Sequence, residues 1–321
     1  MSERMRAAVL VEPGRFEIEE RPLPAPGPGE LRLRLQGSGV CASNLPPFEG
    51  REWFRYPMAP GALGHEGWGL VDAIGPGVTG LAEGMRVASL GGAAYATHDI
   101  VAADAVVPLP RALDGQPFPG EPLGCGVNVY RRADIRPEDT VAIIGLGFIG
   151  AIVCALAADA GARVIAISRR QSSLELARAY GASHCVAMRD HHAIIDEVMA
   201  MTGGEGCARV VEAAGAQWPL DLAGALTRVR GKLVIAGYHQ GARQVDMQLW
   251  NWRGLDVINA HERDPAVYLD GIRGAITAIE AGVFDPTRLY SHHLPLDAIG
   301  EALTLTRDRP EGFVKALIRH D

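Results

Sequence analysis

Hydrophobic and polar positions alternate in short runs through the first third of the chain. Glycine and proline separate these runs, and both residues end strands and favour turns. The pattern predicts extended segments at Met5–Leu10, Glu30–Gly37, Gly67–Ile74, Arg86–Leu90 and Ile100–Pro108. We therefore expect a β-rich domain in this part of the chain.

After Thr140 the pattern changes to buried apolar runs that alternate with helix-period segments. It predicts strands at Val141–Ile144, Arg163–Ile167, Cys185–Ala187, Ala208–Glu212, Lys232–Ile235 and Asp256–Asn259. It predicts helices at Ile149–Ala160, Ser173–Tyr180 and Tyr268–Ala281, before a final strand at Phe313–Ile318. Strands that alternate with helices form parallel, doubly wound sheets. The expected fold class is α/β, with the β-rich segments in a second domain.

The change of pattern indicates two domains. We assign residues 1–124 and 259–321 to the β-rich domain and residues 125–258 to the domain with the parallel sheet. A chain of 321 residues with 48% hydrophobic composition is long enough to bury a core in each.

Composition and charge favour a soluble, cytoplasmic protein. The net charge of −7 comes from interspersed acidic residues, so we expect no nucleic-acid surface. The N-terminal residues lack an apolar signal core, and the apolar stretches are interrupted before membrane-spanning length. We therefore expect a small-molecule substrate and no membrane partner.

The cysteines limit the kinds of metal site that the chain can build. They are odd in number, scattered and free of any Cys-x-x-Cys pair: Cys41, Cys125, Cys154, Cys185 and Cys207. This spacing argues against a disulfide framework and against a zinc site of four thiolates. A metal site in this chain must combine different ligand types.

A glycine-rich turn lies between the first predicted parallel strand and its helix. Its residues are Gly145, Leu146, Gly147, Phe148, Ile149 and Gly150. Glycines at this junction let bare backbone approach a pyrophosphate at a helix N-terminus. Because strand, glycines, helix and second strand follow in order, we interpret the motif as a dinucleotide site rather than as a tight turn alone.

The end of the second parallel strand indicates which dinucleotide binds. An acidic residue there would accept hydrogen bonds from a ribose 2′-hydroxyl and would repel a 2′-phosphate. This chain has Ser168, Arg169 and Arg170 instead. Arginine offers forked, permanently charged donors to a phosphate, so the sequence favours NADP over NAD. The alternative is that both arginines are simply solvated at a helix start.

Residues of metal-ligand type lie at three places in the predicted β-rich domain: Cys41, the pair His65 and Glu66, and Glu121. Each of them alone is ordinary, because single cysteines and histidines are more often structural. Together they offer thiolate, imidazole and carboxylate groups. That mixture is typical of a catalytic zinc with one position open for water or substrate.

These motifs, in this order, resemble the zinc-dependent medium-chain dehydrogenase/reductase family, which includes alcohol, sorbitol and threonine dehydrogenases. The resemblance extends through essentially the whole chain. Its landmarks are Gly39-Val40-Cys41-Ala42-Ser43, Gly64-His65-Glu66-Gly67, Gly84-Met85-Arg86-Val87, Glu121-Pro122-Leu123, the turn at Gly145 and Gly231-Lys232-Leu233-Val234. It implies a GroES-like catalytic domain joined to a Rossmann NADP-binding domain.

The resemblance also implies a zinc site of the polyol dehydrogenase type. Cys41 and His65 would be ligands, Glu66 a direct or exchanging ligand, and Glu121 a neighbour of the metal or its water. Gly124 stands where classical alcohol dehydrogenases have a second cysteine ligand, so Cys125 is not expected to bind the metal. Zinc would act as a Lewis acid on the substrate oxygen while hydride passes to the nicotinamide. Ser43 matches the first hydroxyl of the family's proton relay, with an ordinary turn serine as the alternative.

Three departures from the family pattern change what we expect. Asn44 replaces the aspartate that orients the metal-bound histidine; its amide can accept the histidine N–H bond but brings no charge. Pro46 replaces the terminal histidine of the relay, so another group or solvent must take the proton. Gly91–Thr97 leaves no room for the four-cysteine lobe that binds a structural zinc. We therefore expect one catalytic zinc and no structural zinc.

Aromatic and polar residues at two places suggest a polyhydroxylated substrate such as a sugar, polyol or cyclitol. The candidate substrate contacts are Phe48, Trp53, Trp250, Asn259 and His261. Aromatic rings cover C–H faces and polar groups bind hydroxyls. Packing in the core or at an interface is the alternative for these residues.

The leading hypothesis is an NAD(P)-linked, zinc-dependent oxidoreductase that interconverts a secondary alcohol and a ketone. One alternative is a zinc-free relative that reduces the C=C bond of an enone or quinone. Another is a non-catalytic nucleotide-binding or structural protein, because a fold alone does not prove activity. We also expect a homodimer or homotetramer, formed as in the family by pairing edge strands of the cofactor domain.

Overall fold

The computed structural model describes residues 3–320 and contains two compact units. Unit 1 consists of Met1–Gly124, Asp264–Ile276 and Pro286–Asp321, and unit 2 consists of Cys125–Arg263 and Thr277–Asp285. Residues 259–263 and 277–285, which the sequence pattern places in the β-rich domain, thus group with the parallel sheet. Within the described range, no helix is both long and apolar enough to cross a membrane.

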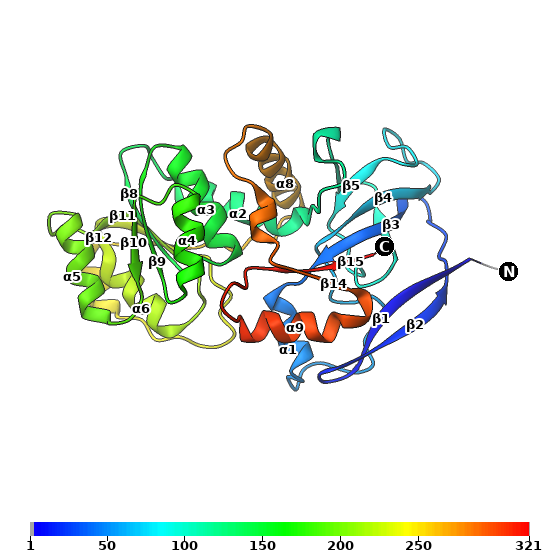
Figure 1. Ribbon diagram of the computed structural model, residues 1–321, viewed down its shortest axis with the longest axis horizontal. Helices are drawn as coiled ribbons and strands as arrows, with labels where there is room; N and C mark the ends of the chain where they lie inside the picture. Colours follow the sequence, from blue (N-terminus) through cyan, green and yellow to red (C-terminus); the bar gives the residue numbers. More distant parts are fainter. Residues whose placement is uncertain (1–2, 321) are drawn as a thin grey trace. The chain divides into compact units, whose positions relative to one another are not determined.

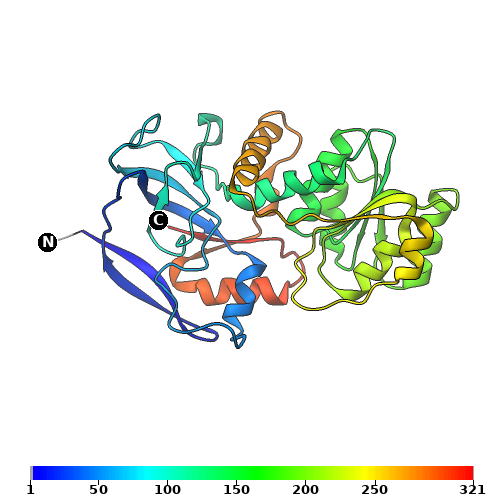
Figure 2. The same ribbon diagram turned by 180° about the vertical axis from the view of Figure 1, so that it is seen from behind.

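Unit 1 is built on a mixed sheet whose strands run in the order β14-β15-β3-β4-β5-β7, with β6 also paired to β3. The strands are β3 (Glu30–Gly39), β4 (Gly67–Ile74), β5 (Arg86–Ser89), β6 (His98–Ala102), β7 (Val106–Pro108), β14 (His292–Pro295) and β15 (Ala316–Arg319). A hairpin of β1 (Arg4–Glu12) and β2 (Arg15–Pro22), dark blue in Figure 2, forms a separate two-stranded sheet.

Alternation along β3 explains where the core of unit 1 lies. Leu31, Leu33 and Leu35 are buried on one face and pack with Val71 and Val87 of the neighbouring strands. Successive side chains of a strand point to opposite faces, so every second residue of β3 enters this core.

Helices cover other parts of unit 1. They are α1 (Leu45–Phe48), α9 (Ile299–Asp308), the first part of α8 (Pro265–Glu280), and the short 3₁₀ turns η1 (Ala42–Asn44), η2 (Arg111–Leu113), η3 (Pro286–Leu289) and η4 (Leu296–Ala298). Helices α1 and α9 lie side by side in Figure 1, and Phe48, Ile299 and Leu303 share one apolar cluster.

Unit 2 is a six-stranded sheet in the order β10-β9-β8-β11-β12-β13, with every pair parallel. Its strands are β8 (Thr140–Ile144), β9 (Arg163–Ser168), β10 (His184–Ala187), β11 (Cys207–Glu212), β12 (Thr227–Ile235) and β13 (Asp256–Asn259). The strand order reverses between β8 and β11, and ligands of doubly wound sheets bind at such a point.

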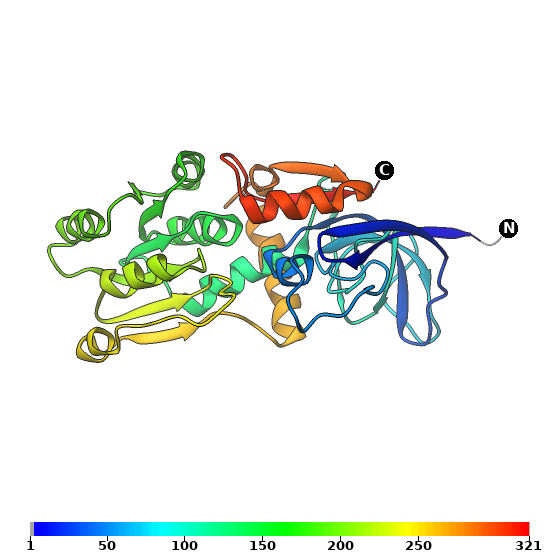
Figure 3. The same cartoon turned by 90° about the horizontal axis from the view of Figure 1, so that it is seen from below.

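Helices cover both faces of this sheet. They are α3 (Phe148–Asp159), α4 (Gln171–Ala179), α5 (His191–Met201), α6 (Gln217–Leu226) and α7 (Met247–Arg253). Figures 1 and 3 show α3 and α4 on one face and α5 and α6 on the other. The remaining helix, α2 (Gly120–Ala133), crosses the boundary between the two units in the sequence.

The structure confirms the expected α/β class, with a β-rich unit and a doubly wound unit. One predicted element is wrong: Ile100–Pro108 is two strands, β6 and β7, separated by a turn in which Ala105 N–H donates to Ala102 O at 3.0 Å. The two strands pair with different partners, β3 and β5, and a single straight strand cannot reach both. The pattern also missed the strands β2 and β14 and the helices α1, α2, α5, α6, α7 and α9.

Candidate metal and cofactor sites

Cys41, His65 and Glu66 come together where two antiparallel strands meet. Cys41 follows β3 and the other two residues precede β4, and Gly39 N–H donates to Glu66 O at 3.1 Å. One ligand atom from each of the three side chains lies within 4.8 Å of the other two. The structure thus places all three predicted ligands in one cluster.

The Glu66 carboxylate is buried and is held by a residue that the sequence pattern did not predict. Lys315, which precedes β15, donates a hydrogen bond from Nζ to Glu66 Oε1 at 2.9 Å and to Val40 O at 3.3 Å. Its Nζ is also 2.7 Å from Oε2, but Oε2 accepts no hydrogen bond from the residues that the structure describes. A Cβ on Gly39 would lie 1.8 Å from Oε2, so only glycine fits beneath this carboxylate.

The His65 ring is oriented by a backbone carbonyl. His65 Nδ1 lies 2.9 Å from Leu63 O, and the Asn44 amide donates to the same oxygen at 3.0 Å. The expectation that Asn44 itself accepts the histidine N–H bond is therefore wrong. Leu63 has a φ of +76°, an unusual backbone conformation for a large side chain, and this turn directs its carbonyl to both neighbours. Nε2 of His65 is left for a ligand.

The short connection before β6 supports this loop. Ala94 N–H donates to Gly64 O at 2.9 Å, and Tyr95 N–H donates to Gly61 O at 3.1 Å. The buried Tyr95 hydroxyl donates to Asn44 Oδ1 at 2.7 Å. This segment therefore braces the His65 loop directly, and Tyr95 explains why Asn44 faces a hydroxyl donor.

Negative charge gathers in the cluster. Burial would lower the pKa of His65, but the hydrogen bond to Cys41 and the charges of Cys41, Glu66 and Glu121 raise it to about 10. Burial likewise opposes the charge of Lys315, and Glu66, Cys41 and Glu121 raise its pKa nonetheless. The site therefore attracts cations.

The donor set fits zinc. A thiol, an imidazole with its Nδ1 already hydrogen-bonded, and a buried carboxylate oxygen without a hydrogen-bond donor match the ligands of catalytic zinc. Glu121 lies in the first turn of α2, outside the three-residue cluster but close enough to act on it electrostatically. Ser43 lies in η1, half-buried, two residues after Cys41.

In unit 2, the glycine-rich turn joins β8 to α3 at the point where the strand order reverses. Gly145 has a φ of +95°, and its N–H donates to Ile167 O at 2.9 Å. A Cβ on Gly150 would lie 2.0 Å from Gly145 O, whereas a Cβ on Gly147 would meet no atom within 4 Å. Gly145 and Gly150 are therefore needed for the turn. Gly147 leaves open space beside the helix N-terminus. The side chains of Leu146 and Phe148 are buried, and that of Ile149 is half-buried.

Ser168, Arg169 and Arg170 occupy the end of β9 and the start of α4. Ser168 is 7% exposed, and its Oγ accepts the Arg170 N–H at 3.4 Å. Arg169 is exposed and Arg170 is half-buried. A serine and two arginines thus follow one another at the carboxyl end of β9, the strand next to β8.

The sequence pattern missed an acid–imidazole pair at the same edge of the sheet. The buried Glu212 ends β11; its Oε1 accepts the N–H groups of Ala214 and Gly215 at 2.8 and 2.7 Å, and its Oε2 lies 2.9 Å from His239 Nε2. Arg243 donates to His239 Nδ1 at 3.1 Å, so the imidazole proton lies on Nε2 and is donated to Glu212. These bonds fix the loop after β12.

The candidate substrate residues lie in different surroundings. Phe48 is 6% exposed and stacks on Phe16 with ring centroids 6.2 Å apart, so it belongs to the core of unit 1. Trp53 is 65% exposed and lies beside Phe54, with ring centroids 6.0 Å apart. Asn259 and His261 are exposed at the end of β13, where Asn259 Oδ1 accepts the His261 N–H at 3.4 Å.

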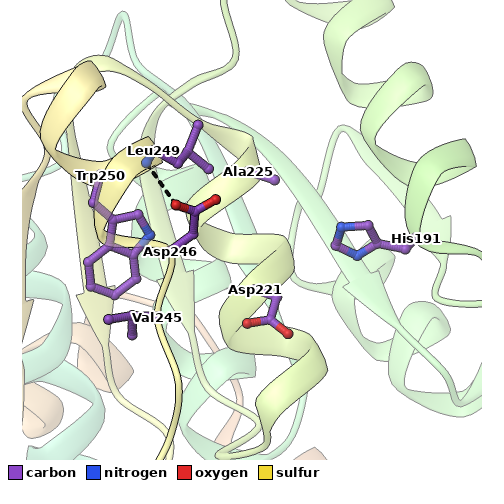
Figure 4. A pocket seen from close by; sticks show the side chains of 7 residues that line it. All are labelled: His191, Asp221, Ala225, Val245, Asp246, Leu249 and Trp250. Carbon is purple, nitrogen blue, oxygen red and sulfur yellow. Dashed lines mark hydrogen bonds between the residues drawn. The ribbon is translucent and has the colours of Figure 1, made fainter.

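Trp250 lines a cavity of about 270 Å³ within unit 2. Figure 4 shows its indole beside Val245 and Asp246, with His191 on a separate helix across the cavity. Trp250 also packs against the apolar core of the parallel sheet. Trp250 and Phe48 therefore pack in or against apolar cores. Core packing was the alternative to substrate contact that the sequence analysis left open for these residues.

Two family models match the chain. The alcohol dehydrogenase GroES-like domain matches residues 27–111, and the zinc-binding dehydrogenase model matches residues 149–268. An alcohol dehydrogenase of Cupriavidus necator is 29% identical over 380 aligned positions, which cover 99% of this chain and 100% of that protein.

A sugar-acid enzyme and a solved structure are also similar. The 2-dehydro-3-deoxy-L-galactonate 5-dehydrogenase of Pseudoalteromonas atlantica is 27% identical, with coverage of 87% of this chain and 88% of that protein. The crystal structure of 2R,3R-butanediol dehydrogenase from Bacillus subtilis has a TM-score of 0.86 at 21% identity, covering 99% of this chain and 100% of that chain. At 21% identity, the similarity to the butanediol dehydrogenase structure shows a shared fold only.

Proposed function

The chain belongs to the zinc-type medium-chain dehydrogenase/reductase family, and we propose that it interconverts a secondary alcohol and a ketone with one catalytic zinc and NADP. Its relatives support the general activity, which is the interconversion of alcohols and ketones by an oxidoreductase. The observation that carries the zinc proposal is the convergence of Cys41, His65 and the hydrogen-bond-free Oε2 of Glu66.

Each residue of the cluster has a separate task in this proposal. Cys41 Sγ, His65 Nε2 and Glu66 Oε2 hold the zinc, and Leu63 O fixes the tautomer and orientation of His65. Bound zinc supplies Lewis-acid polarisation of the substrate oxygen. Ser43 accepts the proton that the alcohol releases and passes it to water, because Pro46 cannot continue a relay. Lys315 positions the Glu66 carboxylate, and Glu121 adds negative charge nearby.

Ser168, Arg169 and Arg170 carry the preference for NADP. The serine hydroxyl and two guanidinium groups give a 2′-phosphate charge-assisted donors, and no carboxylate at the end of β9 is placed to accept the 2′-hydroxyl of NAD. The backbone of Gly145–Gly150 binds the pyrophosphate.

We propose a polyhydroxylated substrate of the sugar, polyol or cyclitol type. Two features support this class: the exposed Trp53 in the unit that carries the metal cluster, and a relative whose name specifies a sugar acid. A large exposed indole is costly to leave in water and covers the C–H face of a sugar well. Asn259 and His261 stay candidate contacts to hydroxyl groups.

We further propose that the protein is a homodimer or a homotetramer assembled through β13. This strand is the last of its sheet and carries exposed residues, among them Val257 at 39% exposure. Pairing with a second copy would protect this edge. Sedimentation at micromolar concentration should give a species at least twice the mass of the chain, and a monomer would contradict the proposal.

Turnover measurements test the function. The protein should oxidise members of a panel of polyols, sugars and cyclitols with NADP⁺, lose activity with a zinc chelator, and regain it when zinc is restored. NAD⁺ should support lower activity. Reduction of an enone or quinone by protein free of metal, without oxidation of any alcohol, would contradict the proposal and favour the zinc-free alternative. No turnover on either panel would favour a non-catalytic protein.

A further inference from the structure

A small hollow in unit 1 is lined by two arginines and by no acidic residue. It measures about 140 Å³ and is lined by Gln36, Trp68, Arg86, Gly115, Gln116, Arg319 and His320. None of these seven residues is an aspartate or a glutamate. A water molecule takes up ~30 Å³ in the liquid, so the hollow has room for one compact group but not for a nucleotide.

Arg86 is a rigid part of this lining. Its Nε donates to Gln36 Oε1 at 2.8 Å, its Nη1 donates to Leu113 O at 2.7 Å, and its Nη2 donates to Gln116 O. Three bonds in one plane fix the guanidinium, so its charge stays at the hollow. Gln36 Oε1 accepts one of these bonds, and the Gln36 amide nitrogen brings N–H donors to the hollow.

Arg319 brings a second guanidinium with its donors unused. It ends β15, and its guanidinium carbon lies 6.0 Å from the ring centroid of Trp68. The side chain is half-buried, and among residues 3–320 no side chain or carbonyl accepts a hydrogen bond from it. Stacking on the buried Trp68 ring limits its movement while its N–H donors stay free.

The two like charges are poorly compensated. Burial lowers the pKa of Arg86, Asp114 opposes this effect, and the charge of Arg319 lowers the pKa further. Two guanidinium groups that repel each other across a small hollow are stabilised by an anion between them, and guanidinium groups bind carboxylate and phosphate oxygens in pairs.

We propose that the hollow between Arg86 and Arg319 is a binding site for a small oxyanion, either a carboxylate or a phosphate group. Arg319 supplies the forked donors, the Gln36 amide adds another, and the Trp68 ring forms an apolar wall. Neither the metal cluster nor the dinucleotide turn shares a residue with this site, so it is additional to the proposed catalytic function.

Calorimetric titration of the full chain with inorganic phosphate and with benzoate tests this site. Arg319→Gln removes the free guanidinium without breaking a hydrogen bond of the fold. Arg34→Gln is the matched control, because Arg34 is an exposed arginine of β3 in the same sheet. We expect saturable binding of at least one anion, weakened about tenfold or more by Arg319→Gln, since hydrogen bonds to charged groups are the stronger ones. The control should bind like the unmodified protein.

The comparison separates this site from other places where anions bind. Phosphate or benzoate that binds at the metal cluster or at Arg169 would be unaffected by Arg319→Gln. Equal binding by Arg319→Gln and the unmodified protein, or no saturable binding of either anion, would overturn the proposal. Binding of phosphate alone would identify phosphate groups as the ligand class, and binding of benzoate alone would identify carboxylates. Arg319→Lys should bind with intermediate affinity, because it keeps the charge and loses the fork.

Discussion

Lys315 Nζ lies 2.9 Å from Oε1 and 2.7 Å from Oε2 of Glu66, and both side chains are buried. The chain has two lysines, Lys232 and Lys315, and uses arginine for its other basic residues. An ammonium is a compact point charge that fits beside a single buried carboxylate. Lys315 therefore neutralises the Glu66 carboxylate beside Cys41 and His65.

Lys315→Met should destabilise the metal-free protein strongly. The substitution leaves the Glu66 carboxylate buried without its cation, and breaking a buried ion pair in this way typically costs about 3–5 kcal/mol. Urea unfolding of protein treated with a chelator measures the change, and added zinc should recover part of the loss because the metal supplies positive charge to Glu66.

Lys232→Met provides the control for this experiment. Lys232 is a half-buried residue that pairs with the exposed Asp134 at 3.4 Å, and such pairs contribute at most about 1 kcal/mol. Equal stability losses for the two lysine variants would show that Lys315 does not neutralise a buried charge.

Ser168→Asp should change the cofactor preference. A carboxylate at this position repels a 2′-phosphate and accepts hydrogen bonds from a ribose 2′-hydroxyl, so NADP should bind at least tenfold more weakly and NAD more tightly. Fluorescence titration with both cofactors measures the shift. Ser183→Asp, which adds the same charge to an exposed residue of the same unit, should leave both affinities unchanged. NADP affinity that survives Ser168→Asp would rule out the assignment.

Ser43→Ala should slow turnover by about 10²–10⁴ because it removes the proposed proton acceptor next to Cys41. Zinc content and NADP affinity should stay the same, since the hydroxyl is neither a ligand nor a phosphate contact. Steady-state kinetics with a deuterated alcohol shows whether hydride transfer limits the rate. Full turnover by the variant under that condition would exclude the serine as the proton acceptor.

Asp99 gives unit 1 a pH-dependent stability. Burial raises its pKa from 3.8 to about 6, although the Ala93 N–H donates to its carboxylate at 3.3 Å. Between about pH 4 and pH 6 the folded state keeps a proton that the unfolded state has lost. The free energy of unfolding should therefore fall as pH rises through this window, by at most about 3 kcal/mol.

Asp99→Asn should remove most of that decline, because an amide does not titrate. Thermal unfolding between pH 4 and pH 7 measures it, with Asp104→Asn, an exposed acid of the neighbouring turn, as the control. If stability declines with pH by the same amount in Asp99→Asn and in the unmodified protein, a group other than Asp99 causes the decline.

The sequence predicts those parts of the fold whose signal is local. The strands of the parallel sheet are short apolar runs and the helix α3 follows glycines, so both were expected from the pattern. The hairpin strand β2 escaped because its apolar alternation is short: Phe16 and Ile18 are its only residues that pack on the apolar core, and the rest of Arg15–Pro22 is mostly charged. The split of β6 from β7 depends on which neighbour each strand pairs with, and no local pattern records that choice.

The same distinction holds for the site. Cys41, His65 and Glu66 were predicted because their residue types and flanking glycines form recognisable motifs. Lys315 was not, because it is a single lysine 249 positions away from its partner Glu66 along the chain. The Leu63 carbonyl could not be predicted either, since a backbone atom of a strained turn leaves no trace in residue type.

Zinc analysis of two cysteine variants tests the central claim most directly. Cys41→Ser removes a ligand of the proposed site, whereas Cys125→Ser changes another half-buried cysteine outside it. The unmodified protein and Cys125→Ser should each bind about one zinc per chain, and Cys41→Ser should lose most of it after dialysis against a weak chelator. Undiminished zinc in Cys41→Ser would contradict the proposed metal site and the zinc-dependent function built on it.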